Sequence, residues 1–372
     1  MTDAAETPDQ APGAPHPRET EKIFGQDAAQ QAFLDAFNSG RLHHGWLLSG
    51  PRGIGKATLA WRIARFLLAT PPPQDGGLFG APPPVTSLDI DPEHPIARRV
   101  ASGGEPGLAV IRRTVSEETK RLRNEIVAED IRRLNKFFGL SAADGGHRVV
   151  IVDAADEMNP TAANALLKML EEPPAHSTLL LVSHQPSRLL PTIRSRCRTL
   201  RLSPLGPADM AAAMEQTGVD LPENTEHLTV LASGSVGAAL RLVSMDGLRL
   251  YADLIALLNT LPRLDRPRAI ALADSVSGRG ASDKFALLLD LIDTALSRLA
   301  MTGVAGAPPA PEAAAGEAQV LARLADTPAR GRAWAERAGE IMARTRHGAA
   351  VNLDPGALVL DTVFKLQDTA AG

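Results

Sequence analysis

A glycine-rich segment at residues 49–58 constrains the fold of this chain more than any other feature of the sequence. It follows an apolar run at residues 46–48, typical of a short buried strand, and precedes residues 59–68, whose pattern is typical of a helix. Strand, glycine-rich loop and helix in this order are the context of a phosphate-binding P-loop. In such a loop, backbone N–H groups, a helix N-terminus and a lysine converge on an anion. The alternative, a tight turn with a chance lysine, does not account for the complete spacing. The expected nucleotide-binding positions here are Gly50, Gly53, Gly55, Lys56 and Thr58.

The loop departs from the P-loop motif at the position that holds the metal. The motif places Ser or Thr directly after the lysine, where the hydroxyl group binds Mg²⁺, but this chain has Ala57. Thr58 comes one residue later, about 100° around the helix, so its hydroxyl is expected to point elsewhere. The segment therefore predicts a loop that can hold phosphate but is poorly equipped to hold Mg²⁺, and we assign no metal ligand.

Bulk properties exclude several classes of protein. A chain of 372 residues is expected to form two or three domains, and a formal net charge of −4 argues against a stand-alone basic nucleic-acid binder. The single cysteine, Cys197, excludes an internal disulfide and a multi-cysteine zinc site. No apolar stretch is long enough to span a membrane, and no signal peptide is visible. We expect a cytoplasmic protein.

Two later strands carry polar residues at their ends. Residues 148–153 form an apolar run that ends in Asp153, where a P-loop protein places the aspartate that reaches Mg²⁺. The alternative is an acid that caps a loop. An active ATPase usually has a glutamate next, but Ala154 follows here, and Glu157 is not expected to substitute for it. The run 178–182 leads to Ser183, a further candidate nucleotide-binding residue. Strands alternating with helices indicate an α/β fold with a parallel sheet covered on both faces.

Four segments of the chain carry a shared signature. They are Gly-Arg-Leu-His-His at 40–44, the P-loop, Asn-Ala-Leu-Leu-Lys-Met-Leu-Glu-Glu-Pro-Pro at 164–174, and Ser-Arg-Cys at 195–197. Together they resemble the AAA+ subunits of bacterial DNA polymerase III clamp loaders. The resemblance covers residues 23–245 strongly and the remainder only in order and length. It implies an AAA+ P-loop domain, a small helical lid and an all-α collar through which subunits assemble.

The resemblance also indicates which kind of subunit this is. Motor subunits (gamma and tau) carry Ser/Thr after the lysine, an Asp-Glu pair after the strand, and a sensor-2 arginine. This chain has Ala57, Ala154 and Gly237 at those positions. Three losses with different chemical roles indicate that the site does not hydrolyse ATP. Arg196 is retained, and the resemblance implies that it enters the ATP site of the neighbouring subunit as an arginine finger. The combination resembles the delta prime subunits of the family.

Composition and the resemblance divide the chain into four parts. The predicted parts are a disordered tail at 1–21, an AAA+ domain at 22–203, a helical lid at 204–247 and a helical collar at 248–372. After residue 207 the pattern indicates helices only, with a flexible Ala/Pro/Gly-rich loop at 302–316. A plain helical bundle is the alternative to a collar. Delta prime subunits often carry a four-cysteine zinc module after the P-loop helix. The corresponding stretch, 71–107, is rich in Pro and Gly at its start and has no cysteine, so no zinc is expected.

The sequence thus predicts a non-hydrolysing stator subunit that helps load the sliding clamp onto primed DNA. The expected partners are the gamma/tau motor subunits and the delta subunit, with the clamp and primer-template DNA reached through the assembled complex, and no membrane. ATP or ADP bound without hydrolysis is left open. Arg62, Arg65 and the basic segment 112–123 are candidate DNA contacts, although a solvated loop is the preferred interpretation of the latter. The rival reading is a self-sufficient AAA+ ATPase, either a motor subunit or a helicase-like remodeller.

Overall fold

The computed structural model describes residues 10, 14–70, 83–139, 146–222, 224–278 and 281–372. The chain divides into two compact units. The first comprises the residues up to 219 together with 234–237, and the second comprises 220–233 with 238–372. The boundaries predicted for the lid and the collar stay predictions.

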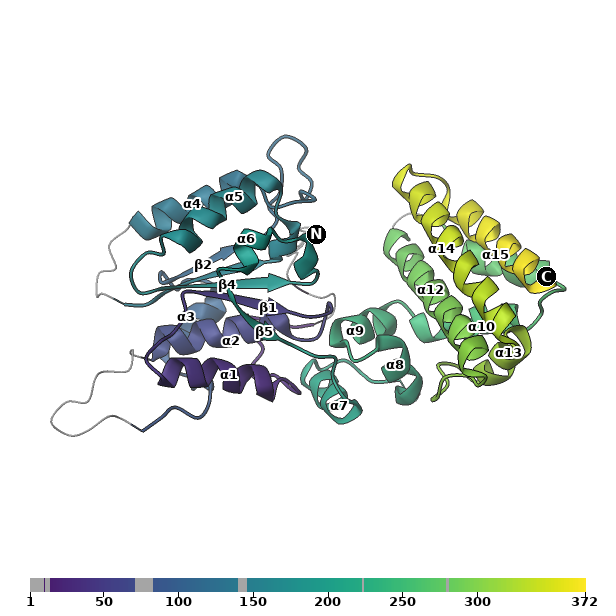
Figure 1. Ribbon diagram of the computed structural model, residues 1–372, viewed down its shortest axis with the longest axis horizontal. Coiled ribbons are helices and arrows are strands. Elements are labelled where there is room, and N and C mark those ends of the chain that lie inside the picture. The colour runs from purple at the N-terminus through teal and green to yellow at the C-terminus, as the bar shows by residue number, and fades with distance from the viewer. Residues whose placement is uncertain (1–9, 11–13, 71–82, 140–145, 223, 279–280) are drawn as a thin grey trace. The chain divides into compact units, whose positions relative to one another are not determined.

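The first unit is built on a five-stranded parallel sheet (Figure 1). Its strands are β1 (Gly45–Ser49), β2 (Leu108–Ile111), β3 (Arg148–Asp153), β4 (Ser177–Ser183) and β5 (Arg198–Arg201), in the order β2-β3-β4-β1-β5. The central strands are buried on both faces, as the continuous apolar runs predict. This confirms the predicted α/β class. In the register, Ser49 lies beside Ser183, and Asp153 lies beside Val182. The three polar residues therefore meet at the carboxyl edge of the sheet.

Helices cover the sheet on both faces (Figure 1). On one face lie α1 (Asp27–Asn38), α2 (Lys56–Ala69) and α3 (Pro95–Ser102), and on the other α4 (Ala128–Gly139) and α5 (Pro160–Glu171). Alternate residues of β1 belong to the two hydrophobic cores on either face of the sheet. Trp46 and Leu48 pack toward α1 and α2, and Leu47 packs toward α4 and α5. The pair Asn159-Pro160 predicts the start of a helix, with Asn as the N-cap and Pro in the first turn. The structure confirms it: the Asn159 side chain caps α5 and accepts a hydrogen bond from the Ala162 amide. The short α6 (Pro191–Arg194) and α7 (Pro207–Gln216) complete the helices of this unit.

Helices alone make up the described part of the second unit. They are α8 (Thr225–Ala232), α9 (Val236–Ser244, whose first two residues belong to the first unit), α10 (Gly247–Leu258), α11 (Arg266–Asp274), α12 (Ser282–Ala305), α13 (Glu317–Leu324), α14 (Pro328–Ala350) and α15 (Pro355–Ala371). The long helices α12 and α14 pack closely where Gly303 meets Gly331. A Cβ atom added at Gly303 would lie 2.5 Å from the Cα of Gly331, so only glycine allows this approach.

The sequence missed two elements of the first unit. Helix α3 lies inside the 71–107 stretch, and its Val100 is fully buried in the core. Strand β5 was not predicted because its alternating pattern buries only Leu200, as expected for a half-exposed strand at the edge of a sheet. Residues 71–82, the Pro/Gly-rich start of that stretch, lie outside the described residues.

The described end of the predicted tail packs against α2. His16 is only 4% exposed, and its ring meets Trp61 edge-on at 5.6 Å between centroids. Arg65 donates a hydrogen bond to the carbonyl of Thr20 at 2.7 Å, and Arg62 donates one to the carbonyl of Glu21. Composition did not predict this packing, because it depends on a few side chains of α2 rather than on an apolar run in the tail.

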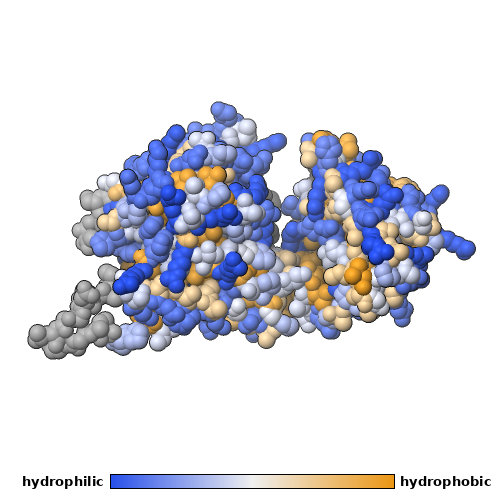
Figure 2. Space-filling model, viewed as in Figure 1, coloured by the Kyte–Doolittle hydropathy of each residue, from blue (hydrophilic) through white to orange (hydrophobic). Residues whose placement is uncertain are grey.

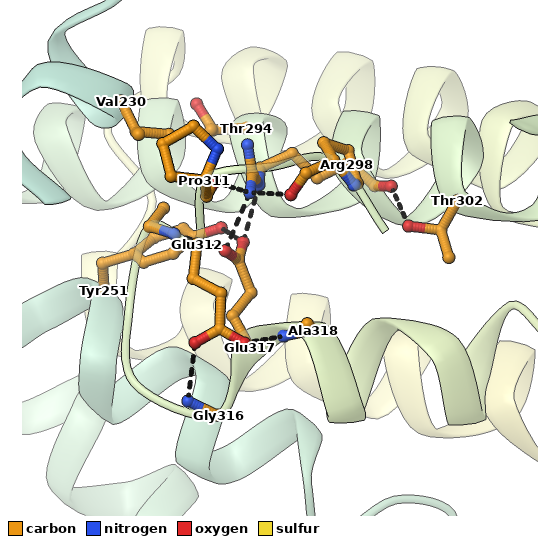
Figure 3. A network of polar contacts seen from close by, with 12 residues as sticks. Val230, Tyr251, Thr294, Arg298, Thr302, Pro311, Glu312, Gly316, Glu317 and Ala318 are labelled. Atoms are coloured by element: carbon orange, nitrogen blue, oxygen red, sulfur yellow. Dashed lines mark hydrogen bonds and ion pairs between the residues drawn. The ribbon is translucent and has the colours of Figure 1, made fainter. Parts of the chain in front are cut away.

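The loop predicted as flexible at 302–316 is held by a buried network (Figure 3). Helix α12 extends to Ala305, into the predicted loop. The side chain of Arg298 pairs with Glu317, which is fully buried, and also donates to the carbonyls of Pro309 and Pro311. The hydroxyl of Tyr251 donates to the same Glu317 carboxylate at 2.6 Å. Polar anchors at both ends therefore order a loop whose composition indicates flexibility.

The surface carries only scattered large apolar side chains. On the face shown in Figure 2 hydrophilic residues predominate, with apolar patches between them. The most exposed large apolar residue described is Val304, at 71%. None of the helices in the described part of the chain has the length and apolarity needed to cross a membrane.

Candidate functional site

The P-loop is present, and its lysine is turned back onto the loop. Gly50, Gly53 and Gly55 have φ angles of 147°, 73° and 97°, which favour glycine. Lys56 begins α2 and is 3% exposed, and its ammonium group donates a hydrogen bond to the carbonyl of Pro51. Burial lowers the pKa of Lys56 to about 8, although Asp153 and Asp156 act in the opposite direction. The lysine therefore lies at the predicted site with its charge already engaged.

Ala57 and Thr58 follow in the first turn of α2, and both are half-buried. The hydroxyl required for Mg²⁺ is thus missing at position 57. Among the described residues, no three His, Cys, Asp or Glu side chains gather in a group that could hold a metal ion.

The acidic residues after β3 are engaged by other groups. Asp156 accepts hydrogen bonds from the amides of His184 and Gln185 at 2.9 and 3.2 Å. Burial would raise the pKa of Asp156, but the His184 amide and the side chains of His184 and Ser183 outweigh it, so the pKa is lowered. The carboxylate of Glu157 contacts two arginines, Arg52 of the P-loop and Arg113, each at 2.9 Å. Both carboxylate oxygens of Glu157 are therefore engaged by arginine side chains, which opposes their use in orienting a water molecule.

A segment distant in sequence closes over the P-loop. The hydroxyl of Ser235 donates to the carbonyl of Arg52 at 2.9 Å, and the amide of Gly237 donates to the carbonyl of Gly53 at 3.1 Å. A Cβ atom at position 237 would lie 3.0 Å from the Cα of Gly53. Gly237, the position where the resemblance implies a sensor-2 arginine, therefore places backbone directly on the loop.

His184 lies beside this site and was not singled out in the sequence. It follows Ser183, the last residue of β4, so its place just after a strand end was the available signal. Burial, together with Lys56 and Arg52, lowers the pKa of His184 to about 4, so the imidazole is neutral at pH 7. Its Nδ1 atom is buried and has no hydrogen-bond partner within the described part of the chain.

Arg196 lies elsewhere in the unit, after α6, in a corner where three of the family-like segments meet. Its guanidinium group pairs with Glu171 at the end of α5 (Nη2 to Oε1, 2.9 Å) and donates from Nη1 to the carbonyl of Thr192 at 3.1 Å. A ring nitrogen of His44 lies 2.9 Å from the carbonyl of Leu170. The corner therefore joins the 40–44, 164–174 and 195–197 segments, while the side chain of Arg196 stays 37% exposed.

The two candidate DNA contacts on α2 differ in burial. Arg62 is 6% exposed and pairs with Asp89 at 2.8 Å, so it does not face DNA in the conformation described. Arg65 is half-buried and donates to the Thr20 carbonyl described above, and its contact with DNA stays a prediction. The segment 112–123 instead contains a hairpin, with Val115 bridged to Leu122, whose tip exposes Lys120 and Arg121.

The chain is similar in sequence to several known subunits of DNA polymerase III. The family described as "DNA polymerase III, delta subunit" matches residues 25–206. DNA polymerase III subunit delta' of Pseudomonas aeruginosa is 38% identical over 218 residues, 57% of this chain and 60% of that protein. Subunit delta' of Bacillus subtilis is 30% identical over 182 residues, 49% of each chain. The gamma subunit of Buchnera aphidicola is 28% identical over 256 residues, 68% of this chain and 64% of that protein.

A solved structure of a DNA polymerase III gamma subunit-related protein from Thermotoga maritima aligns over 91% of this chain and 99% of its own, with 16% identity and a TM-score of 0.46. A score at this level does not establish a shared fold, so the fold class rests on the sheet described above.

The first unit is thus a P-loop α/β domain whose residues 25–206 match the DNA polymerase III delta subunit family. The chain is related to the clamp-loader subunits of DNA polymerase III, and its resemblance to the delta prime subunits is confirmed. The matches span less than two thirds of each of these three curated relatives.

Proposed function

We propose that this chain acts as a delta prime-type stator of a clamp loader, does not hydrolyse ATP itself, and supplies Arg196 to the ATP site of a neighbouring gamma/tau-type subunit. It would assemble with gamma/tau and delta subunits and would reach the sliding clamp and primer-template DNA through that complex. The relatives support the assembly, since they include delta', gamma and tau subunits.

The state of the P-loop carries this proposal. The carbonyls of Pro51, Arg52 and Gly53 all accept hydrogen bonds from within the chain. The metal hydroxyl is replaced by Ala57, and Glu157 is neutralised by two arginines. The site keeps Asp153, but the loss of the hydroxyl ligand for Mg²⁺ and the engagement of Glu157 both support the proposal that it does not hydrolyse ATP.

Arg196 differs from the P-loop groups because it is partly exposed and keeps donors for a partner. Its side chain is partly exposed, and an in-trans arginine that stabilises charge on a transferring phosphoryl group contributes about 10³–10⁵ in rate. A surface salt bridge with no partner role is the alternative for this residue.

Two measurements test the proposal. The purified chain with Mg²⁺ should show no ATP turnover, whether or not it binds a fluorescent ATP analogue. In the complex reconstituted with the gamma/tau and delta subunits of the same organism, Arg196→Ala should lower ATP turnover while assembly is unchanged. Arg196→Lys should fail as well, because the planar fork is lost. Unchanged turnover in the Arg196→Ala complex would reject the finger.

The second candidate function is a self-sufficient AAA+ ATPase. It is favoured by Lys56 lying close enough to Asp153 for their charges to interact, and by similarity to gamma and tau subunits. Turnover by the purified chain that disappears in Lys56→Ala would establish this function instead.

A further inference from the structure

We infer that Glu171 is a positioning residue for Arg196: it holds the guanidinium group in a set orientation before the neighbouring subunit arrives. The inference rests on the proposed function, because it assigns a role in presenting the same arginine. It concerns an acidic residue that lies 25 positions away in the sequence and has no place in the P-loop.

The backbone at Arg196 is tightly packed against the start of β1 and the end of α5. A Cβ atom added at Gly45, the first residue of β1, would lie 3.0 Å from the Leu170 side chain, 3.1 Å from the Arg196 carbonyl and 3.3 Å from the sulfur of Cys197. Position 45 therefore admits little more than glycine, and the sheet, the end of α5 and the backbone of Arg196 form one packed corner. Only the side chain of Arg196 is left to be oriented.

Two contacts supply that orientation. The Glu171 carboxylate forms an ion pair with Nη2 at 2.9 Å, and the Thr192 carbonyl accepts a hydrogen bond from Nη1 at 3.1 Å. A guanidinium group is a rigid planar fork with five N–H donors, so anchoring both of its terminal nitrogens fixes the plane of the group. The remaining donors stay available for a phosphate. Holding a long side chain in its working orientation removes the entropy cost of ordering it later.

The placement of Glu171 is unfavourable for its own helix. It is the last residue of α5, and Glu172 follows at the C-cap, so two acids lie at the negative end of the helix dipole. The contact with Arg196 compensates one of them. Both partners are partly exposed, with side-chain exposures of 37% for Arg196 and 48% for Glu171, so the pair adds little to the stability of the fold. An acid in an unfavourable position at a helix C-terminus that does not stabilise the fold indicates a role in function.

The test measures ATP turnover by the reconstituted complex carrying Glu171→Ala, Glu171→Asp or Glu172→Ala in this chain. Glu171→Ala should lower kcat about threefold to tenfold while KM for ATP stays within about twofold, because the finger is misplaced only at the transition state. Glu171→Asp should restore part of the rate. Glu172→Ala removes the same charge from the same helix end and should leave kcat unchanged.

Combining Glu171→Ala with Arg196→Ala separates this role from a structural one. In the Arg196→Ala background, Glu171→Ala should have no further effect, because its only route to the reaction is through the arginine. A loss of rate in that background, or an unchanged kcat in Glu171→Ala alone, would overturn the inference. If Arg196→Ala itself left turnover unchanged, the proposed function would fall, so the two failures are distinguishable.

Discussion

Arg298 in the helical unit and Arg196 in the sheet unit are the same side chain in opposite settings. Arg298 is buried, and its donors are taken by the carboxylate of Glu317 and the carbonyls of Pro309 and Pro311 (Figure 3). Arg196 makes one ion pair and one hydrogen bond, and it keeps donors at the surface. The contrast separates a charge that stabilises the fold from one that can contact a partner: the former is buried, with its Nε and Nη2 groups paired within the chain.

The P-loop is like Arg298, because its polar groups are engaged within the chain. Its lysine and its carbonyls are engaged by the chain itself, and the amide of Gly237 donates to the loop where the family resemblance implies an arginine. Substitutions in the two settings test this division.

The two arginines should differ most in their effect on stability. Arg298→Ala leaves Glu317 buried without its charge partner, and breaking a buried pair costs about 3–5 kcal/mol of unfolding free energy. Arg196→Ala removes an exposed pair and should change stability by less than about 1 kcal/mol. Denaturant unfolding of both variants gives the comparison, and similar losses in the two would break it.

The buried Lys56 should make stability depend on pH. Its pKa is lowered from 10.5 to about 8, so between these values the unfolded chain binds more protons than the folded chain, and stability rises with pH. Lys56→Met removes this dependence. We expect the unfolding free energy of the unsubstituted chain to rise by about 3 kcal/mol relative to Lys56→Met from pH 8 to 10.5. Parallel pH profiles would show that the lysine is solvated.

The sequence predicted the features that local patterns specify, but not the contacts between residues far apart in the chain. The P-loop, β3 and the capped start of α5 were predicted, because strand runs, glycine spacing and an Asn-Pro start are local patterns. The closure by Ser235 and Gly237, and the pairing of Glu157 with Arg52 and Arg113, were not. They join residues far apart in the chain, and a single sequence carries no signal for contacts of that kind.

The closure of the P-loop can be tested with two glycines. Gly53 and Gly40 have similar positive φ angles, 73° and 67°, but a Cβ atom at Gly53 would collide with the Ser235 hydroxyl, while the space at Gly40 is open. Gly40→Ala should cost about 1 kcal/mol for backbone strain alone. Gly53→Ala should cost about 2–3 kcal/mol, because the segment carrying Ser235 must also move. Equal costs in thermal or denaturant unfolding would show that the closure adds nothing.

The hairpin tip should give the smallest effect. Lys120 and Arg121 are the exposed basic residues there, but Glu117 and Glu118 lie on the same hairpin and offset them. If the tip contacts DNA phosphates in the assembled complex, replacing both basic residues with Gln should make the slope of log affinity against log salt concentration shallower by about 2. The loss should be similar for different DNA sequences, because phosphate contacts carry no base information.

Arg263 and Arg266, both exposed in the helical unit, provide the matched control, since their replacement with Gln removes the same charge from the chain. A general electrostatic attraction would respond equally to both double variants. A local contact would respond only to the hairpin. An unchanged slope in the hairpin variant would place Lys120 and Arg121 among solvated surface charges, and would leave Arg196 as the exposed basic residue of this unit to which a role toward a partner is assigned.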